Sequence, residues 1–464
     1  MSNKIFLTEG RMPVNRDLLT APVRPLILRI ALPSMGAMIA SSLGALLDTL
    51  LLGRSHAQLS AAVSVSFSLL TLIQTLGFTL GMGAGSFVSR CIGRSNKPDA
   101  YAAASTALFA ALAISLPLCA AGLFFLRPLV SMLGAEGELI DPAARYARYV
   151  LLSAPLLCVS LVLSSLLRAQ GKTLPNLLAF AGGAAAGVGL ELLLTPRLGV
   201  HGAGAAMLVR ESSTLILLAG SMIKEKRLVR PRLRAVCFRL SVYRNIMRSG
   251  LPTLLRQGLM SVSSVLLTRA AAAFGESILA GVGLAVRVAS LVSSAVIGFG
   301  QGFQPVCGAA FGAGNTERVR QAYRFCLRAA MLALAFAGAA VFVFARRLLA
   351  PFDPGGSALD IAVRALRAQS AVFFAQGAVI MMNMLTQAMG LPVRASIIAT
   401  SRQGFVFIPL ILLLPRLFGE SGLILCQSAS DLVSLALCFL LVRGILTDCA
   451  CARGGCSDAQ TASR

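Results

Sequence analysis

Charged residues are scarce in this chain of 464 residues: they make up 13% of it, whereas hydrophobic residues make up 56%. The mean hydropathy is +0.80. A soluble domain cannot keep that much apolar surface away from water, because its surface leaves too few polar groups to cover it. The composition therefore excludes an ordinary soluble protein and indicates an integral membrane protein.

Residues typical of catalytic and metal sites are also few. There are two histidines, His56 and His201, and both lie next to predicted loops. No close pair of acids and no nucleophile–base pattern is evident, so we predict no enzymatic activity. The glycine-rich segments lack the Gly-Lys-Ser/Thr of a phosphate loop. The cysteines of the tail, within 449–456, are too few and too irregularly spaced for a structural zinc site. We therefore expect no bound metal and no cofactor other than a coupling ion.

Long apolar segments recur along the whole chain. A helix of about 20 apolar residues is long enough to cross roughly 30 Å of hydrocarbon, whereas strands of a membrane barrel alternate over ~10 residues. The pattern predicts an all-α integral membrane protein with twelve transmembrane helices. The segments are 27–53, 61–87, 101–126, 146–167, 175–195, 203–223, 250–274, 279–305, 325–345, 365–390, 396–415 and 422–443.

The two halves of the chain repeat at a constant offset. Leu32-Pro33 recurs as Leu251-Pro252, and 251 − 32 is 219. The same offset relates Gly93 to Gly312, Asn96 to Asn315, Gly171 to Gly390 and Pro196 to Pro415. Six helices return each half to its starting side, so the repeats are parallel and form two pseudo-symmetric six-helix bundles, typical of alternating-access transporters. A twelve-helix scaffold without transport is the alternative.

These repeats divide the chain into five parts. We predict a cytoplasmic N-terminal segment 1–25, an N-terminal bundle 26–223 and a basic cytoplasmic linker 224–249. A C-terminal bundle 250–443 and a cytoplasmic tail 444–464 follow. No cleavable signal peptide is evident at the start, which is polar and basic.

The basic residues that produce the net charge of +24 gather in every second loop. Such an asymmetry orients a membrane protein with its basic loops in the cytoplasm. It predicts that both termini are cytoplasmic, and a solvated basic face is favoured over nucleic-acid binding. The residues include Arg90, Arg94, Lys97, Arg168, Lys172, the stretch 224–248, Arg318, Arg320, Arg394 and Arg402.

Two acids lie inside otherwise uncharged apolar segments. They are Asp48 and Glu191, and their equivalents at the repeat offset are Leu267 and Leu410. The repeat therefore tolerates leucine at both places, and a charge at mid-membrane costs about 2.5–3.5 kcal/mol. Burial disfavours the charged form of a carboxylate, so this pair is suited to take up a proton or a small cation. The alternatives are an interfacial acid for Asp48 and a hydrogen-bonded glutamate near the outer helix end for Glu191.

Other polar residues in apolar segments are candidates for a transport cavity. Arg210 and Glu211 are adjacent, so they point about 100° apart on a helix and need not pair. Arg210 could instead pair with Asp48 or Glu191. The candidate cavity residues are Arg210, Gln257, Arg287 and Gln301.

Pro33 lies inside the first apolar segment. A proline removes one backbone hydrogen bond from a helix and favours a kink there. In a moving bundle that kink is a candidate hinge, and a static kink is the alternative.

The ordered set of motifs resembles the multidrug and toxic compound extrusion (MATE) family, in its bacterial form, from about Pro25 to Arg443. The motifs are "LP…LLDTLLLGR" in the first half, and "GQGFQPVCGAAFGAGNTERVRQAYR" and "SRQGFVFIPLILLLPRLFGESG" in the second. The resemblance implies export of drugs or metabolites coupled to inward movement of H⁺ or Na⁺. It places Asp48 on the cation-coupling aspartate of helix one and Glu191 on a second acid in helix five.

Several positions depart from the family pattern. Gly187 stands where an asparagine often precedes the second acid, Val209 where a threonine often follows, and Ala310 where helix eight often has asparagine. The segments 251–274 and 364–390 contain no carboxylate. A Na⁺ site needs several oxygen ligands, so these departures favour H⁺ as the coupling ion.

The resemblance leads us to expect an antiporter in the inner membrane of a bacterium. It would act as a monomer, contact the lipid bilayer and no nucleic acid, and export small organic cations or amphipathic compounds. The alternative is a flippase for a lipid-linked cell-envelope precursor, which Arg256, Arg269 and Arg287 would favour by forming a basic cavity.

Overall fold

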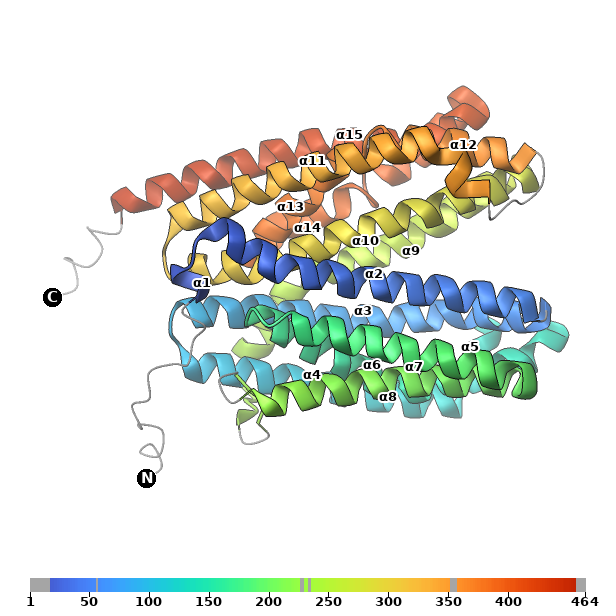
Figure 1. The fold of residues 1–464 in the computed structure, drawn as a ribbon, viewed down its shortest axis with the longest axis horizontal. Helices are drawn as coiled ribbons and strands as arrows, with labels where there is room; N and C mark the ends of the chain where they lie inside the picture. The colour runs from blue at the N-terminus through green and yellow to red at the C-terminus, as the bar shows by residue number, and fades with distance from the viewer. Residues whose placement is uncertain (1–16, 56, 226–228, 233–234, 351–356, 456–464) are drawn as a thin grey trace.

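The computed structural model describes residues 17–55, 57–225, 229–232, 235–350 and 357–455. At residues 17, 45–55, 57–62, 64, 357 and 444–455 it describes the backbone alone. The regular structure of these residues is helical, in agreement with the predicted class (Figure 1). The helices are α1 (Asp17–Thr20), α2 (Val23–Ser55), α3 (Ala57–Gly93), α4 (Lys97–Phe124), α5 (Leu126–Met132), η1 (Gly137–Leu139), α6 (Ile140–Ala169), α7 (Leu174–Leu198), α8 (Val200–Lys224), α9 (Leu240–Ala272), α10 (Glu276–Gly312), α11 (Thr316–Leu349), α12 (Ser357–Ser370), α13 (Phe373–Met389), α14 (Pro392–Ser401) and α15 (Phe407–Gly455).

The predicted apolar segments all fall on these helices. Within the described residues, nine helices are long and apolar enough to cross a membrane, or ten if the bent pair α12–α13 is one span. The seventh predicted segment is α9, which begins at Leu240, ahead of the predicted boundary at 250. The eleventh falls on α14 and the start of α15, and the twelfth follows a kink at Gly419 inside α15. The twelve-segment pattern is thus confirmed.

The repeat is visible in how the helices begin and end. The side chain of Asn96 caps α4 by accepting a hydrogen bond from the Asp99 N–H, and Asn315 caps α11 in the same way. Gly171 and Gly390 follow α6 and α13 with φ of 77° and 75°, a left-handed conformation that costs glycine little. Both pairs obey the offset of the sequence repeat, so the same residue types begin and end equivalent helices in both halves.

The two halves, α2–α8 and α9–α15, each have a hydrophobic core, and each core receives residues from the other half's first helix. Ile27 of α2 is buried in the core of the second half. Its equivalent in the repeat, Ile246 of α9, is buried in the core of the first half. The halves are therefore joined by an exchange of the starts of α2 and α9, so the predicted boundaries at 26 and 250 do not separate two independent packing units.

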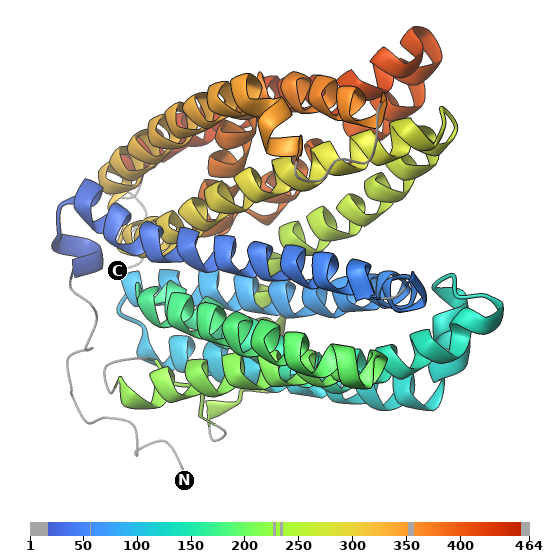
Figure 2. The ribbon, with the colours of Figure 1, turned by 45° about the vertical axis from the view of Figure 1, so that its right-hand side comes forward.

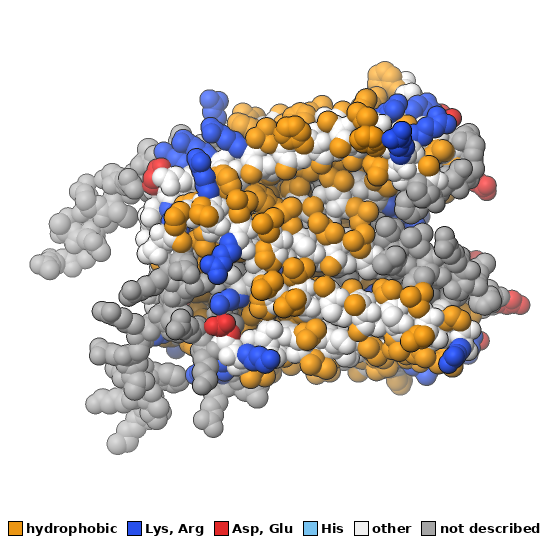
Figure 3. All heavy atoms as spheres, viewed as in Figure 1, with side chains coloured by type: hydrophobic (Ala, Val, Ile, Leu, Met, Phe, Trp, Pro, Cys, Tyr) orange, Lys and Arg blue, Asp and Glu red, His pale blue; other side chains and the backbone are white. Residues whose placement is uncertain are grey.

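The halves meet at one end of the molecule and diverge toward the other (Figure 2). Gly93 lies against Ala309, and Gly302 lies against Ala31. We call this the closed end; it carries the α3–α4, α6–α7 and α10–α11 connections, the start of α2 and the end of α15 (Figure 1). Hydrophobic side chains cover the middle of the face in Figure 3, whereas Lys and Arg gather toward its ends, as a membrane-embedded surface requires.

Candidate functional site

Asp48, the first predicted coupling acid, lies in α2 at a place where only the backbone is described. Its side chain is therefore outside the described residues, and its role remains a prediction. Pro33 lies inside the same helix, which is one continuous helical segment from Val23 to Ser55. The hinge at Pro33 also remains a prediction.

Glu191, the second predicted acid, is buried inside the first half. Its exposed fraction is 5%. The buried residues of α7 recur every three or four positions and thus form one face of the helix; they are Asn176, Ala179, Gly183, Gly187, Glu191 and Thr195. This face packs on α8, because side chains added at Gly183 and Gly187 would meet Thr214 and Arg210. Glu191 is therefore held within the protein rather than toward lipid.

Arg210 packs where the resemblance suggests an asparagine. A Cβ at Gly187 would lie 2.8 Å from Cβ of Arg210, so the arginine side chain passes directly over the glycine, one helical turn before Glu191. Its Nε lies 3.5 Å from Oε1 of Glu211. The adjacent side chains thus form an ion pair, although their positions on the helix did not require one. The first half carries a polar group of Glu191, Arg210 and Glu211 between α7 and α8.

The other predicted cavity residues do not form one cluster with Arg210. Gln257 is buried in α9 and Gln301 is buried in α10, with exposed fractions of 8% and 5%. Arg287 of α10 is exposed. It precedes Gly298 by about three turns, so the two differ by only about 20° around the helix. Because Gly298 lies against Ser34 and Met35 of the first half, Arg287 is on the face of α10 that points toward that half.

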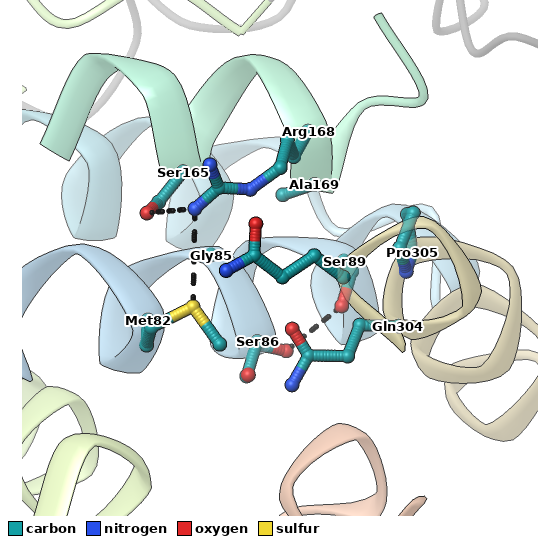
Figure 4. A pocket seen from close by; sticks show the side chains of 10 residues that line it. Met82, Gly85, Ser86, Ser89, Ser165, Arg168, Ala169, Gln304 and Pro305 are labelled. Carbon is teal, nitrogen blue, oxygen red and sulfur yellow. Dashed lines mark hydrogen bonds between the residues drawn. The ribbon is translucent and has the colours of Figure 1, made fainter. Parts of the chain in front are cut away.

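Gln301 lines a pocket near the closed end, between α3, α6 and α10 (Figure 4). Arg168 reaches into it and donates to the hydroxyls of Ser164 at 2.7 Å and Ser165 at 2.8 Å. Arg168 was expected on a solvated basic face, yet its exposed fraction is 8%. The space that water-sized molecules can occupy in this pocket is only about 20 Å³. Drug-sized ligands need roughly 300–1,000 Å³, so this pocket is too small to be the substrate cavity in this conformation.

Arg90 joins the halves at the closed end. Its guanidinium donates to the carbonyl oxygens of Gln387 at 3.3 Å and Ala388 at 3.2 Å, at the end of α13. It also donates to the hydroxyl of Ser249 on α9 at 3.0 Å. A positive charge at the carboxyl end of a helix also interacts favourably with the helix dipole. Arg90 was expected on the solvated face too; instead it is a buried contact between the halves.

The second half contains an intramembrane acid that the sequence analysis missed. Asp431 of α15 is fully buried, and its Oδ1 lies 2.5 Å from Nε of Arg402. Gln427 donates to the same oxygen at 3.3 Å, while Oδ2 has no hydrogen-bond partner among the described residues. The signal was present, because Asp431 interrupts an apolar run just as Asp48 and Glu191 do. Arg402, assigned to the basic face, is instead the partner of this acid.

A shift in the repeat concealed Asp431. Gly199 and Gly419 have similar backbone angles, φ of 52° and 59°, and their offset, 419 − 199, is 220. Gly202 lies against Leu194 as Gly422 lies against Leu414, at the same enlarged offset. The repeat has thus gained one position between Gly390, which obeys the offset of 219, and Leu414, which obeys 220, so the sequence match of Pro196 with Pro415 is not a structural equivalence. At this offset the equivalent of Asp431 is Glu211, so the sixth helix of each half carries an acid at the same place.

Two pseudo-symmetric six-helix halves that meet at one end, with acids buried in each, are the architecture of a membrane transporter. The MatE family model matches residues 33–192 and 252–413, and the chain belongs to this family. Its relatives include the multidrug export protein MepA of Staphylococcus aureus (strain NCTC 8325 / PS 47), 22% identical over 92% of this chain and 96% of that protein.

Solved structures show the same fold. One is the outward-facing conformation of a multidrug resistance MATE family transporter of the MOP superfamily. It has a TM-score of 0.89 at 24% identity and covers 94% of this chain and 98% of its own. A MATE protein in the bent conformation has a TM-score of 0.86 at 24% identity, with the same coverage of both chains.

Proposed function

We propose that this protein exports cationic or amphipathic compounds from the cell in exchange for protons. Membership of the MatE family and similarity to the multidrug export protein MepA support export of drugs. The observation that supports proton coupling is the burial of the Glu191 carboxylate inside the first half, where 5% of the residue's surface is exposed. Such an acid binds a proton without needing the several oxygen ligands that Na⁺ needs.

The closed end faces the cytoplasm in this proposal. It carries the connections that are rich in lysine and arginine, and basic loops remain on the cytoplasmic side of a bilayer. Both ends of the chain are then cytoplasmic. The conformation with the halves joined at this end and diverging at the other is accordingly the one that opens outward.

The transport cycle begins when the outward-facing protein takes up one proton at Asp48, which Glu191 shares. Loss of the negative charge weakens the attraction for a bound organic cation, which leaves to the outside. Helix α2 then bends or repacks near Pro33, the halves part at the closed end, and the proton is released to the cytoplasm. Exchange of one proton for one monovalent cation moves no net charge, so the pH gradient drives it and supplies about 1.4 kcal/mol per pH unit, enough for a concentration ratio of about ten.

Coupling to Na⁺ is the less favoured form of this proposal. Segments 251–274 and 364–390 contain no carboxylate, and Gly187 has no side chain to offer as a ligand. The side chain of Arg210 lies over Gly187, and its positive charge opposes a metal cation there. The flippase alternative is not favoured, because the relative MepA is by name a multidrug exporter.

Reconstituted vesicles test the proposal directly. The full chain is placed in proteoliposomes with a fluorescent organic cation such as ethidium, and a proton gradient and a sodium gradient are imposed separately. We expect the proton gradient to drive concentrative transport and the sodium gradient to have no effect. Transport driven by sodium at constant pH would overturn the choice of ion, and no transport with either gradient would overturn the proposed activity.

A further inference from the structure

Two transmembrane helices of the second half are broken inside the bundle. Helices α12 and α13 are bent by 53° at their junction, and α14 ends at Ser401, before α15 begins at Phe407. The equivalent helices of the first half, α6 and α7, are continuous. In transporters, a break within a span leaves backbone and side-chain groups available to a ligand, and irregular backbone is tolerated where it lines a polar site.

Polar side chains from the two breaks meet. Arg402 is the first residue of the second break, and Gln376 lies at the start of α13, just beyond the first. Oriented to satisfy its neighbours, the Gln376 amide oxygen accepts from both terminal nitrogens of Arg402, at 3.2 and 3.3 Å, and from the hydroxyl of Ser293 on α10. Asp431 holds Arg402 from the opposite side through Nε. The guanidinium is thus fixed at the place where the breaks meet.

Helix α9 brings a second arginine to the same place. Ser263 donates to the carbonyl oxygen of Gln403 in the break, and Leu259 lies against Gly404. Arg256 precedes Ser263 by about two turns, so it lies on the same face of α9. It is close enough to Arg402 for the two positive charges to repel each other.

The charges of this cluster do not balance. Two guanidinium groups share one carboxylate, because among the described residues Arg256 has no acidic side chain within 4.0 Å. Asp431 offers Arg402 a single oxygen, so the pair is not bidentate. Both arginines keep some accessible surface, and that of the Arg402 side chain is 15%. A surplus positive charge within a membrane is costly unless a counter-charge accompanies it.

We propose that Arg256 and Arg402 form a binding site for a monovalent anionic group in the second half. Their N–H groups donate to the anion, since guanidinium binds chloride and carboxylate oxygens through charge-assisted hydrogen bonds. Gln376 and Asp431 are positioning residues that orient Arg402. The anionic group comes either from a resident chloride ion or from the carboxylate of a substrate. Only the second source rests on the proposed export function.

Calorimetric titration of the purified full chain in detergent tests this site, with sodium methanesulfonate as background salt. Chloride and benzoate are the probes. We expect saturable binding of at least one of them to the wild type, weakened at least tenfold in Arg256→Gln and largely restored in Arg256→Lys. The matched control is Arg347→Gln, at an exposed arginine of α11, which should leave binding unchanged. Absence of saturable binding in the wild type, or equal binding in Arg256→Gln, would overturn the proposal.

The two sources of the anion give different results. Binding of chloride that benzoate does not displace identifies a resident ion. Displacement of chloride by benzoate, or binding of benzoate alone, identifies a carboxylate site. In vesicles, Arg256→Gln should then reduce transport of a fluorescent zwitterion severalfold while it spares ethidium, which has no carboxylate. Because the titration needs no gradient, failure of proton coupling leaves its result intact, and failure of anion binding leaves cation export intact.

Discussion

Gly93 and Gly312 make the same contact in opposite directions. A side chain on Gly93 would collide with the carbonyl group of Ala309, and one on Gly312 would collide with the carbonyl of Arg90. Positions 90 and 309 are themselves equivalent in the repeat. The contact between the halves is therefore isologous, as in a two-fold symmetric dimer, with its axis along the membrane normal. The reciprocal burial of Ile27 and Ile246 obeys the same symmetry.

Replacing one of these glycines with a larger residue should separate the two halves at the closed end. Gly93→Val places methyl groups against backbone that cannot move aside, at a cost of about 1–3 kcal/mol. Such a cost shifts the balance between closed and open forms by roughly ten- to a hundredfold. Electron–electron distance measurements between spin labels on the α3–α4 and α10–α11 connections should show a longer separation. Gly189→Val is the control, because nothing lies within 4 Å of its added Cβ. Unchanged distances in Gly93→Val would contradict the role of this contact.

Removing the Arg90 guanidinium should make the residues buried between the two halves at the closed end more accessible. Hydrogen bonds to charged groups contribute about 1.5–3 kcal/mol each, and Arg90→Gln loses those to Gln387 and Ala388. The neighbouring Cys91, 4% exposed, reports the effect. We expect its labelling by a maleimide, followed site by site with mass spectrometry, to become at least tenfold faster. Arg324→Gln, at an exposed arginine of α11, should leave that rate unchanged, and equal rates in both variants would argue against Arg90 as a clamp.

The membrane makes much of this fold readable from the sequence. A span must be a long apolar helix, so the segment pattern locates the helices, and the constant offset of the repeat separates the two halves. Glu191 was found for the same reason, because an acid in an apolar run is conspicuous. The inter-half contact itself could not be predicted, since glycines such as Gly93 and Gly189 look alike until the neighbouring helix is in place.

The sequence did not predict which arginines turn inward to buried hydrogen-bond or ion-pair partners. Arg90, Arg168 and Arg402 lie at the ends of apolar segments, where composition cannot separate a solvated arginine from one that turns inward. Asp431 was missed because one inserted residue between Gly390 and Leu414 shifted its equivalent from Ser212 to Glu211. A repeat analysed with a single offset therefore conceals the residues that follow an insertion.

The net contribution of the Arg402–Asp431 pair to the stability of the second half should be smaller than the loss of stability caused by removing one partner. Asp431→Asn leaves the guanidinium without its counter-charge and should destabilise the protein by about 3–5 kcal/mol, whereas replacing both partners with apolar residues of similar size is often nearly neutral. Thermal unfolding followed with a thiol-reactive dye gives the midpoint temperature of each variant. The midpoints of Asp431→Asn and Arg402→Gln should be well below that of the double variant Arg402→Met/Asp431→Leu. Additive losses in the double variant would show that the two side chains act independently.

Glu191→Gln should separate substrate binding from proton coupling. The amide keeps the size of the side chain and much of its hydrogen bonding but cannot exchange a proton, so the variant should bind ethidium within a few-fold of the wild type. Its transport should become independent of an imposed pH gradient, and the accumulation ratio should fall toward one. The loss corresponds to the drive of one proton, about 1.4 kcal/mol for each unit of the imposed pH gradient. Glu138→Gln, at an exposed acid, should retain gradient-driven accumulation. If Glu191→Gln still concentrates ethidium when only a pH gradient is present, the proton must be carried by another group, and Asp48 and Asp431 become the residues to test.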